Sequence, residues 1–329
     1  MEASFYESHS NGKVKCVLCP NNCIISDGKS GVCRIRTNID GTLYADSYGE
    51  IVSLAVDPVE KKPLYHFYPG EMILSTGPNG CNLKCGFCQN SEISQKKVIT
   101  RYISPEELAL LATRDGSIGL AYTYTEPFIW FEYIRDTGKL IHKRGGVNVL
   151  VTNGYVNDAP LKELLPLIDA MNVDIKSMKP EFYSKVCGGK LNDVLKTVET
   201  ASGRCHIEIT NLVITNYNDT EKDFEALTDW IYSVNPAMPL HFSRYFPSYN
   251  FKEPPTNPEK LLKAYEIAKS KLKYVYVGNI SLDNCSDTIC PGCGNVLIRR
   301  SNYNTDISGI TKGRCSVCKK DADIIGVSI

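Results

Sequence analysis

The alternation of strand-like and helix-like segments over residues 71–282 constrains the fold more than any other feature of this sequence. Seven short runs have the length and residue types of strands; they lie at 72–76, 118–124, 147–153, 171–175, 206–214, 239–245 and 273–279. Amphipathic segments separate many of them, and the helix predicted over 104–115 begins with Ser104 as N-cap and Pro105 at its first position. Repeated strand–helix units predict a parallel sheet, for which we favour a full or partial β/α barrel over a doubly wound sheet.

Cysteine-rich segments flank this region, and the sequence therefore predicts three domains. They are a Cys-rich metal-binding module over 1–70, the barrel over 71–282, and a zinc-ribbon-like module over 283–329. The chain has no run of about 18 apolar residues, and its first residues lack the pattern of a signal peptide. We therefore expect a cytoplasmic protein without a membrane segment.

Metal binding is the expected role of most of the 14 cysteines, because the cytoplasm keeps thiols reduced. All but Cys187 and Cys205 lie in clusters, and these two are expected in the core, with a hydrogen-atom donor as the alternative for Cys187. Lys and Arg together number 37, as do Asp and Glu, and this zero net charge argues against capture of nucleic acid.

Three cysteines, Cys81, Cys85 and Cys88, stand in the stretch "GCNLKCGFCQN" directly after the predicted strand 72–76. Four-iron clusters normally have four thiolate ligands, so a loop with three leaves one iron open to another ligand. In a parallel α/β protein the loop after a strand is where active sites form. We interpret these three cysteines, called the triad below, as a catalytic cluster site; the alternative is a structural site completed by a distant residue.

At these residues the chain resembles the radical S-adenosylmethionine (SAM) superfamily, with Phe87 in the aromatic position of its C-x3-C-x-φ-C motif. The resemblance implies a partial (β/α)6 barrel and a 4Fe–4S cluster on the triad whose fourth iron binds SAM. It implies that one electron cleaves SAM to methionine and a 5′-deoxyadenosyl radical, which abstracts hydrogen from substrate. It also implies a low-potential electron donor such as ferredoxin or flavodoxin.

Further residues at predicted strand ends match the SAM pocket of this superfamily. The segment "TYTEP" stands where the family has a Gly-Gly-Glu motif, and "DIK" is similar to the "DLK" of glycyl-radical activases. The resemblance implies a cofactor-binding role for Phe87, Thr125, Glu126, Thr152, Asn153, Asp174, Lys176 and His241. The alternative for each is a polar group at the barrel rim that bonds only to the backbone.

Two further sets of four cysteines predict two further metal sites. Cys290, Cys293, Cys315 and Cys318 form two C-x2-C pairs with the spacing of a zinc ribbon, so we expect structural zinc, with an iron site as the alternative. Cys16, Cys19, Cys23 and Cys33 are also expected to bind one metal centre together, either zinc or a second 4Fe–4S cluster. A complete set of four ligands indicates a structural or electron-transfer role.

The combined motifs, including "CVLCPNNC" and "CPGCG", resemble the radical SAM enzymes of the AmmeMemoRadiSam system, a group similar to pyruvate formate-lyase activating enzymes. The resemblance implies Memo-like and AMMECR-like proteins as partners. Three functions are weighed. The first is radical chemistry on an unknown substrate in that pathway, the second is activation of a glycyl-radical enzyme, and the third is a metal-scaffolded binding protein. We favour the first, because two extra metal modules exceed what an activase needs.

Overall fold

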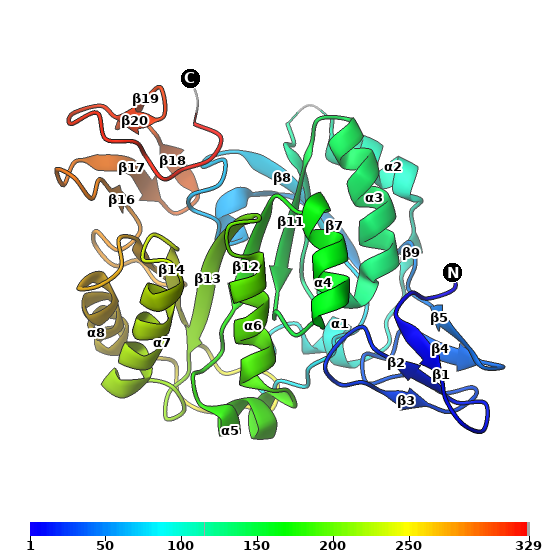
Figure 1. Cartoon of the computed structure of the whole chain (residues 1–329). Coiled ribbons are helices and arrows are strands. Elements are labelled where there is room, and N and C mark those ends of the chain that lie inside the picture. Colours follow the sequence, from blue (N-terminus) through cyan, green and yellow to red (C-terminus); the bar gives the residue numbers. More distant parts are fainter. Residues whose placement is uncertain (115, 328–329) are drawn as a thin grey trace.

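An eight-stranded sheet forms the centre of the computed structural model, which describes residues 1–114 and 116–327 (Figure 1). In spatial order its strands are β15 (Val275–Gly278), β14 (Leu240–Arg244), β13 (His206–Val213), β12 (Ala170–Asp174), β11 (Val147–Thr152), β10 (Gly119–Tyr122), β8 (Met72–Gly77) and β7 (Ser53–Pro58). Seven of these strands are parallel, and β7 pairs antiparallel with β8 at one edge. The predicted parallel α/β sheet is confirmed.

Helices cover the outer face of this sheet (Figure 1). Their bounds are α1 Ser91–Gln95, α2 Pro105–Ala112, α3 Phe131–Lys143, α4 Asp158–Leu164, α5 Pro180–Phe182, α6 Leu191–Ala201, α7 Glu221–Val234 and α8 Pro258–Lys269, with single turns η1 Val59–Lys61, η2 Pro127–Trp130, η3 Leu165–Leu167 and η4 Tyr183–Cys187. Ser104 caps α2 as predicted, by accepting a hydrogen bond from the Glu107 N–H. The last residue of that predicted helix, 115, lies outside the described residues, as do 328 and 329 at the end of the third predicted domain.

Helix α3 has no counterpart among the helices predicted from the sequence. The helix is strongly amphipathic, but it begins with an aromatic residue and contains Gly138, and neither feature indicates a helix in the sequence. A Cβ atom at Gly138 would lie 3.4 Å from the Asn148 side chain on β11, and this glycine lets the helix pack closely on the sheet. Glycine lowers helix propensity because it has no side chain, but at this position the same property allows α3 to pack closely on the sheet.

The N-terminal cysteine module consists of short antiparallel strands beside the lower end of the sheet in Figure 1. They are β1 (Tyr6–Ser8), β2 (Val14–Cys16) and β3 (Ile24–Ile25) in one sheet, β4 (Arg36–Ile39) with β5 (Thr42–Ala45), and β6 (Glu50–Ile51) with β9 (Arg101–Tyr102). Arg36 joins the module to α3 through an ion pair with Glu132, in which Nη2 lies 2.9 Å from Oε1 and both side chains are buried. Strand β7, which lies within the first predicted segment, is part of the central sheet.

The C-terminal module lies at the opposite, upper end of the sheet (Figure 1). It contains β16 (Thr288–Ile289), β17 (Val296–Ser301), β18 (Asn304–Asp306), β19 (Ile310–Thr311) and β20 (Arg314–Cys315). Buried Arg300 donates to the carbonyl of Tyr65 at 2.7 Å. The His66 ring lies 2.7 Å from the Asp323 carbonyl through Nδ1 and 2.6 Å from the Tyr276 hydroxyl through Nε2. These contacts attach the module to the segment that joins β7 to β8.

We expect this attachment to weaken in acid, because burial lowers the pKa of His66 from 6.5 to about 4. Between these pH values the unfolded chain binds a proton on this ring and the folded chain does not, so the free energy of unfolding falls as the pH is lowered. The full effect is about 3 kcal/mol. Urea unfolding of the wild type and His66→Gln at pH 7.5 and 4.5 measures it. Between pH 7.5 and 4.5 the free energy of unfolding of His66→Gln should fall less than that of the wild type. An equal fall would contradict this role of His66.

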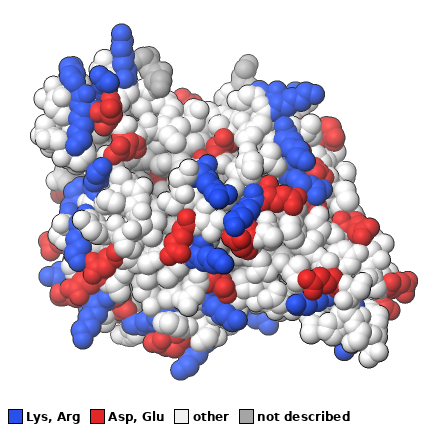
Figure 2. Space-filling view, viewed as in Figure 1, with Lys and Arg blue, Asp and Glu red and all other residues white. Residues whose placement is uncertain are grey.

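The described part of the chain contains no helix long and apolar enough to cross a membrane. Figure 2 shows basic and acidic side chains interspersed over the face that carries the helices. This mixture agrees with the formal net charge of zero. The face in view therefore offers no continuous basic surface for a polyanion.

Candidate active site

A pocket of about 610 Å³ lies on the inner side of the sheet, and the triad cysteines are part of its wall. Its lining includes Ala55 on β7 at one edge of the sheet and Asn279 next to β15 at the other. Residues from both edges reach one pocket only because the sheet curves around it, as in a partial barrel. The volume is in the range of small-molecule and cofactor sites.

The triad loop follows β8 directly and is fixed by close backbone contacts. A Cβ atom at Gly77 would lie 2.0 Å from the Thr123 carbonyl, and one at Gly80 would lie 2.4 Å from the Cys33 carbonyl. Gly80 also has φ +103°, a conformation that side chains rarely adopt. Both glycines therefore allow the loop to enter the pocket between its neighbours.

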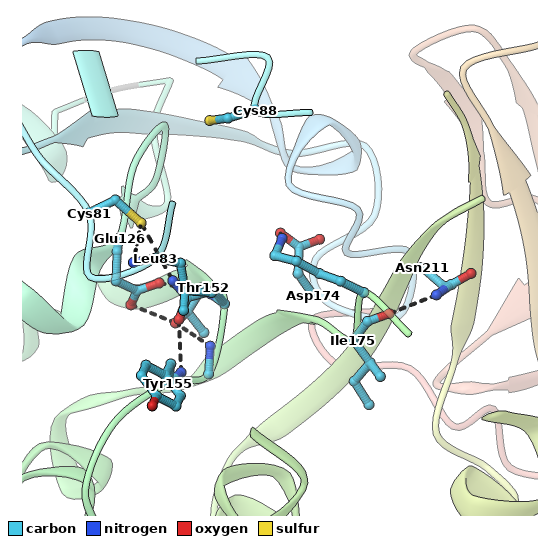
Figure 3. Close-up of polar contacts among 12 residues, drawn as sticks. Cys81, Leu83, Cys88, Glu126, Thr152, Tyr155, Asp174, Ile175 and Asn211 are labelled. Carbon is cyan, nitrogen blue, oxygen red and sulfur yellow. Dashed lines mark hydrogen bonds and ion pairs between the residues drawn. The ribbon is translucent and has the colours of Figure 1, made fainter. Parts of the chain in front are cut away.

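Hydrogen-bond donors lie next to two of the triad sulfurs, and Figure 3 shows those at Cys81. The Leu83 N–H donates to Cys81 Sγ at 3.4 Å, and the Asn153 side-chain amide lies 3.6 Å from the same sulfur. The Ser94 hydroxyl lies 3.2 Å from Cys88 Sγ. Burial raises the pKa of the Cys81 thiol, so its charged form needs the compensation that a metal provides.

Glu126 organises the loop that follows β11 (Figure 3). Its Oε1 accepts from the Thr152 hydroxyl at 2.7 Å and the Phe128 N–H at 2.9 Å, and its Oε2 accepts from the Asn153 N–H at 2.8 Å. Burial raises the pKa of Glu126 to about 7, although these donors oppose the shift. Glu126 is 1% exposed and its oxygens point at protein donors, so the structure supports a positioning role.

Asp174 and Lys176, at the end of β12, supply opposite charges to the pocket. Lys176 Nζ lies 3.1 Å from an Asp174 oxygen and 5.8 Å from the centre of the Phe87 ring. Burial opposes the charged lysine, but Asp174 and the neighbouring thiols hold its pKa well above the usual value. The backbone of the same turn is tied by the Asn211 amide, which donates to the Ile175 carbonyl at 2.7 Å. The pocket thus offers an ammonium group and a carboxylate side by side.

Of the eight predicted cofactor-binding residues, seven line the pocket: Phe87, Thr125, Glu126, Thr152, Asn153, Asp174 and Lys176. His241 is not among the residues that line the pocket. Its Nε2 lies 2.6 Å from buried Glu208, and its ring packs against Tyr65 and Tyr276 outside the pocket. Glu208 is buried in β13 and needs partners for its charge, so it holds His241 away from the cavity.

The sequence did not indicate that the flanking modules reach the pocket. Asp57, Lys61 and Lys62 line it from β7 and η1, and Tyr303 lines it from the C-terminal module. Both lysines pair with Asp57, with nitrogen–oxygen distances of 3.0 and 2.9 Å, and Lys61 Nζ lies 5.3 Å from the Tyr303 ring centre. The doublet Lys61–Lys62 is visible in the sequence, but nothing there places it at the cavity.

The sulfur spacing differs between the cysteine sets. Among the residues that the structure describes, the only group of three or more His, Cys, Asp or Glu whose ligand atoms all lie within 4.8 Å of one another is Cys290, Cys293, Cys315 and Cys318. Their sulfurs approach to 3.6 Å (Cys290 to Cys318) and 3.7 Å (Cys293 to Cys315). A tetrahedral zinc ion with sulfur at about 2.3 Å requires sulfur–sulfur distances of about 3.8 Å. The triad sulfurs are more widely spaced, which suits a larger group.

Gly80→Ala is expected to destabilise the protein by at least about 2 kcal/mol, because the positive φ and the clash with the Cys33 carbonyl act together. We also expect the variant to lose iron from the triad faster than the wild type under a chelator. Thermal unfolding and iron release measure the two effects. Gly116→Ala is the matched control, since it shares the positive φ (+85°) but has open space around it. Equal behaviour of the two variants would show that the contact with Cys33 does not matter.

A curved parallel sheet around a three-cysteine pocket defines the class, a partial-barrel enzyme. The model of the radical SAM superfamily matches residues 76–231. An uncharacterized protein of Methanocaldococcus jannaschii is 42% identical over 334 residues, which cover 98% of this chain and 99% of that protein. A probable GTP 3′,8-cyclase of Thermococcus kodakarensis is 29% identical over 202 residues, 55% of this chain and 63% of the relative. The chain belongs to the radical SAM superfamily.

The solved structures agree with this fold. SuiB of Streptococcus suis, in its complex with SAM, gives a TM-score of 0.50 at 13% identity, covering 61% of this chain and 48% of that one. Membership implies that the protein is an enzyme that uses a 4Fe–4S cluster and SAM, with a reductant such as ferredoxin or flavodoxin.

Proposed function

We propose that Cys81, Cys85 and Cys88 hold the 4Fe–4S cluster and that SAM binds beside it in the pocket of about 610 Å³. The observation that carries this proposal is the position of the three thiols, which line one wall of a cavity that also contains acidic, basic and amide groups. When bound, the cluster supplies the electron that cleaves SAM, and the resulting radical takes a hydrogen atom from substrate.

The charged side chains of the pocket match the charged groups of SAM. Lys176 suits the carboxylate of SAM, and Asp174 suits its ammonium or the ribose diol. The Glu126 carboxylate already accepts hydrogen bonds from the Thr152 hydroxyl and the Asn153 N–H, so we assign it the positioning of these two residues. Phe87 provides an apolar surface beside Lys176 and packs on Phe182 and Phe251 behind it.

For the substrate, we propose a small molecule or an accessible side group, in a pathway with Memo-like and AMMECR-like proteins. Tyr303 and the Lys61–Lys62 pair narrow the pocket from outside the parallel sheet. An activase must admit the glycine loop of a large partner, so these additional walls favour the smaller substrate. Membership in an enzyme superfamily sets aside the binding-scaffold alternative.

The test is anaerobic reconstitution with iron and sulfide, followed by dithionite and SAM, with 5′-deoxyadenosine as the product measured. Wild type should release it together with methionine, and a variant with all three triad cysteines replaced by alanine should release neither. No product from a wild type that contains its full iron complement would overturn the proposal. Addition of a purified glycyl-radical enzyme distinguishes the activase alternative, since only an activase would generate the glycyl radical signal.

We further propose that the C-terminal cysteines bind structural zinc, because their sulfur spacing agrees with a single tetrahedral ion. Few apolar residues form the core of this module, so metal binding has to supply much of its folding free energy.

A further inference from the structure

The N-terminal cysteines surround one small hollow that the proposed function leaves unused. Cys16, Cys19, Cys23 and Cys33 all line it, together with Arg36 and Ile129. Cys16, Cys19 and Cys33 are buried, and Cys23 is partly exposed. Backbone N–H groups support the sulfurs, as the Val32 N–H does for Cys23 Sγ at 3.5 Å. Four thiols around a common space are a complete ligand set for one metal centre.

The spacing of the sulfurs separates the two kinds of centre that four thiolates bind. In the described part of the chain, no three of these sulfurs lie within 4.8 Å of one another, in contrast to the C-terminal quartet. Four sulfurs that all bind one zinc ion at about 2.3 Å lie about 3.8 Å from one another. The wider spacing matches the triad, where the proposed group is a 4Fe–4S cluster.

Arg36 provides an independent sign that an anionic group belongs in the hollow. Its side chain is 1% exposed and lines the hollow, and its Nε has no hydrogen-bond partner among the described residues. The other guanidinium nitrogens bind Glu132 and the Ser4 carbonyl. A 4Fe–4S cluster with four thiolates carries negative charge, and a buried guanidinium next to it lowers the cost of that charge.

The hollow lies directly behind the triad loop. The Cys33 carbonyl is so close to Gly80 that a Cβ atom there would lie 2.4 Å away, and Gly80 is bonded to Cys81. Asn21 donates to the Asn82 carbonyl at 2.8 Å, and Arg34 donates to the Ser94 carbonyl. A ligand of one site therefore contacts the residue adjoining a ligand of the other, which gives a short path for an electron.

We propose that Cys16, Cys19, Cys23 and Cys33 hold a second 4Fe–4S cluster that relays single electrons to the triad cluster. The donor, a reduced flavodoxin or ferredoxin, loses one electron. The N-terminal cluster goes from the 2+ to the 1+ state and returns to 2+ when the triad cluster accepts the electron; no bond forms or breaks. Electrons enter near Cys23, where the adjacent Ile24 is 55% exposed. The relay rests on the proposed function, whereas the cluster site does not.

Metal content of the variant with Cys81, Cys85 and Cys88 all replaced by alanine tests the site without any assay of activity. After anaerobic reconstitution it should retain about four irons and four sulfides, against about eight in wild type. Dithionite should reduce this iron to the electron paramagnetic resonance signal of a 4Fe–4S cluster in its 1+ state. A variant with no iron and with about two zinc ions per chain would overturn the proposal.

The choice of reductant tests the relay. A Cys16→Ser, Cys23→Ser double variant should bind about four irons and cleave SAM with dithionite at a rate within about threefold of wild type. With reduced flavodoxin its rate should fall at least about tenfold. Unchanged cleavage with flavodoxin, or an equal loss with both reductants, would overturn the relay. Failure of the proposed function would differ from both, since wild type itself would then release no 5′-deoxyadenosine.

Discussion

Cys85→Ala is expected to lower 5′-deoxyadenosine formation by at least about a thousandfold, because each thiol of the triad is needed to hold the cluster. Cys85 is 8% exposed and lies deep in the pocket wall, so no water-accessible side chain replaces it. The iron content of the Cys85→Ala variant should fall by about four atoms per chain. Iron analysis and chromatography of the quenched reaction measure the two losses together.

Cys205→Ala is the matched control for this prediction. Cys205 is partly buried, stands outside all three cysteine clusters and does not line the pocket. The control should retain the iron content and the rate of wild type within a factor of about two. If Cys85→Ala kept both its iron and its activity, the triad would not be the cluster site. Loss of activity in both variants would point instead to general damage to the fold.

Cys290→Ala is expected to unfold the C-terminal module while leaving the barrel folded. The module buries only a small cluster around Leu297 and Ile298, and metal binding by four thiolates contributes on the order of 10 kcal/mol. We expect the loss of one zinc ion per chain and rapid proteolysis within 283–327. Zinc analysis and limited trypsin digestion followed by mass spectrometry detect these changes.

Cys285→Ala tests whether the loss of zinc and of protease resistance is specific to the metal-binding cysteines. Cys285 is buried five residues before Cys290 but is not a member of the tight sulfur group. The control should retain zinc and resist trypsin. Equal zinc content and equal protease resistance in Cys290→Ala and wild type would exclude the structural zinc site. Iron on the triad should be the same in all three proteins, because its three cysteine ligands lie outside the C-terminal module.

The central sheet could be predicted because parallel strands that are buried on both faces have a distinctive sequence. Runs such as 147–153 and 206–214 are rich in Val, Ile, Leu and Thr, with isolated polar residues, and are bounded by turns. The same regularity brought Glu126, Thr152, Asn153, Asp174 and Lys176 to one pocket, since strand ends in a parallel sheet meet at one edge. The triad followed from its cysteine spacing, the aromatic Phe87 and its place directly after a predicted strand.

Depth within the barrel and the contributions of the flanking modules could not be predicted in this way. His241 has the correct strand and face, because it pairs in register with Thr210, which lines the pocket. Its ring nevertheless bonds to Glu208, and a buried acid with two histidine partners is a tertiary arrangement without a local pattern. Tyr303 reaches the cavity only because Arg300 and His66 dock its module, and these contacts join residues more than 200 positions apart.

The presence of Tyr303 in the pocket wall makes the shape of the pocket depend on a second part of the structure. Every triad cysteine and every strand of the central sheet lies before residue 279, whereas this part of the wall comes from the C-terminal module. Tyr303 stays at the cavity only while the contacts of Arg300 and His66 keep that module docked. The folding of a module that is distant in sequence therefore sets one boundary of the space available to a substrate.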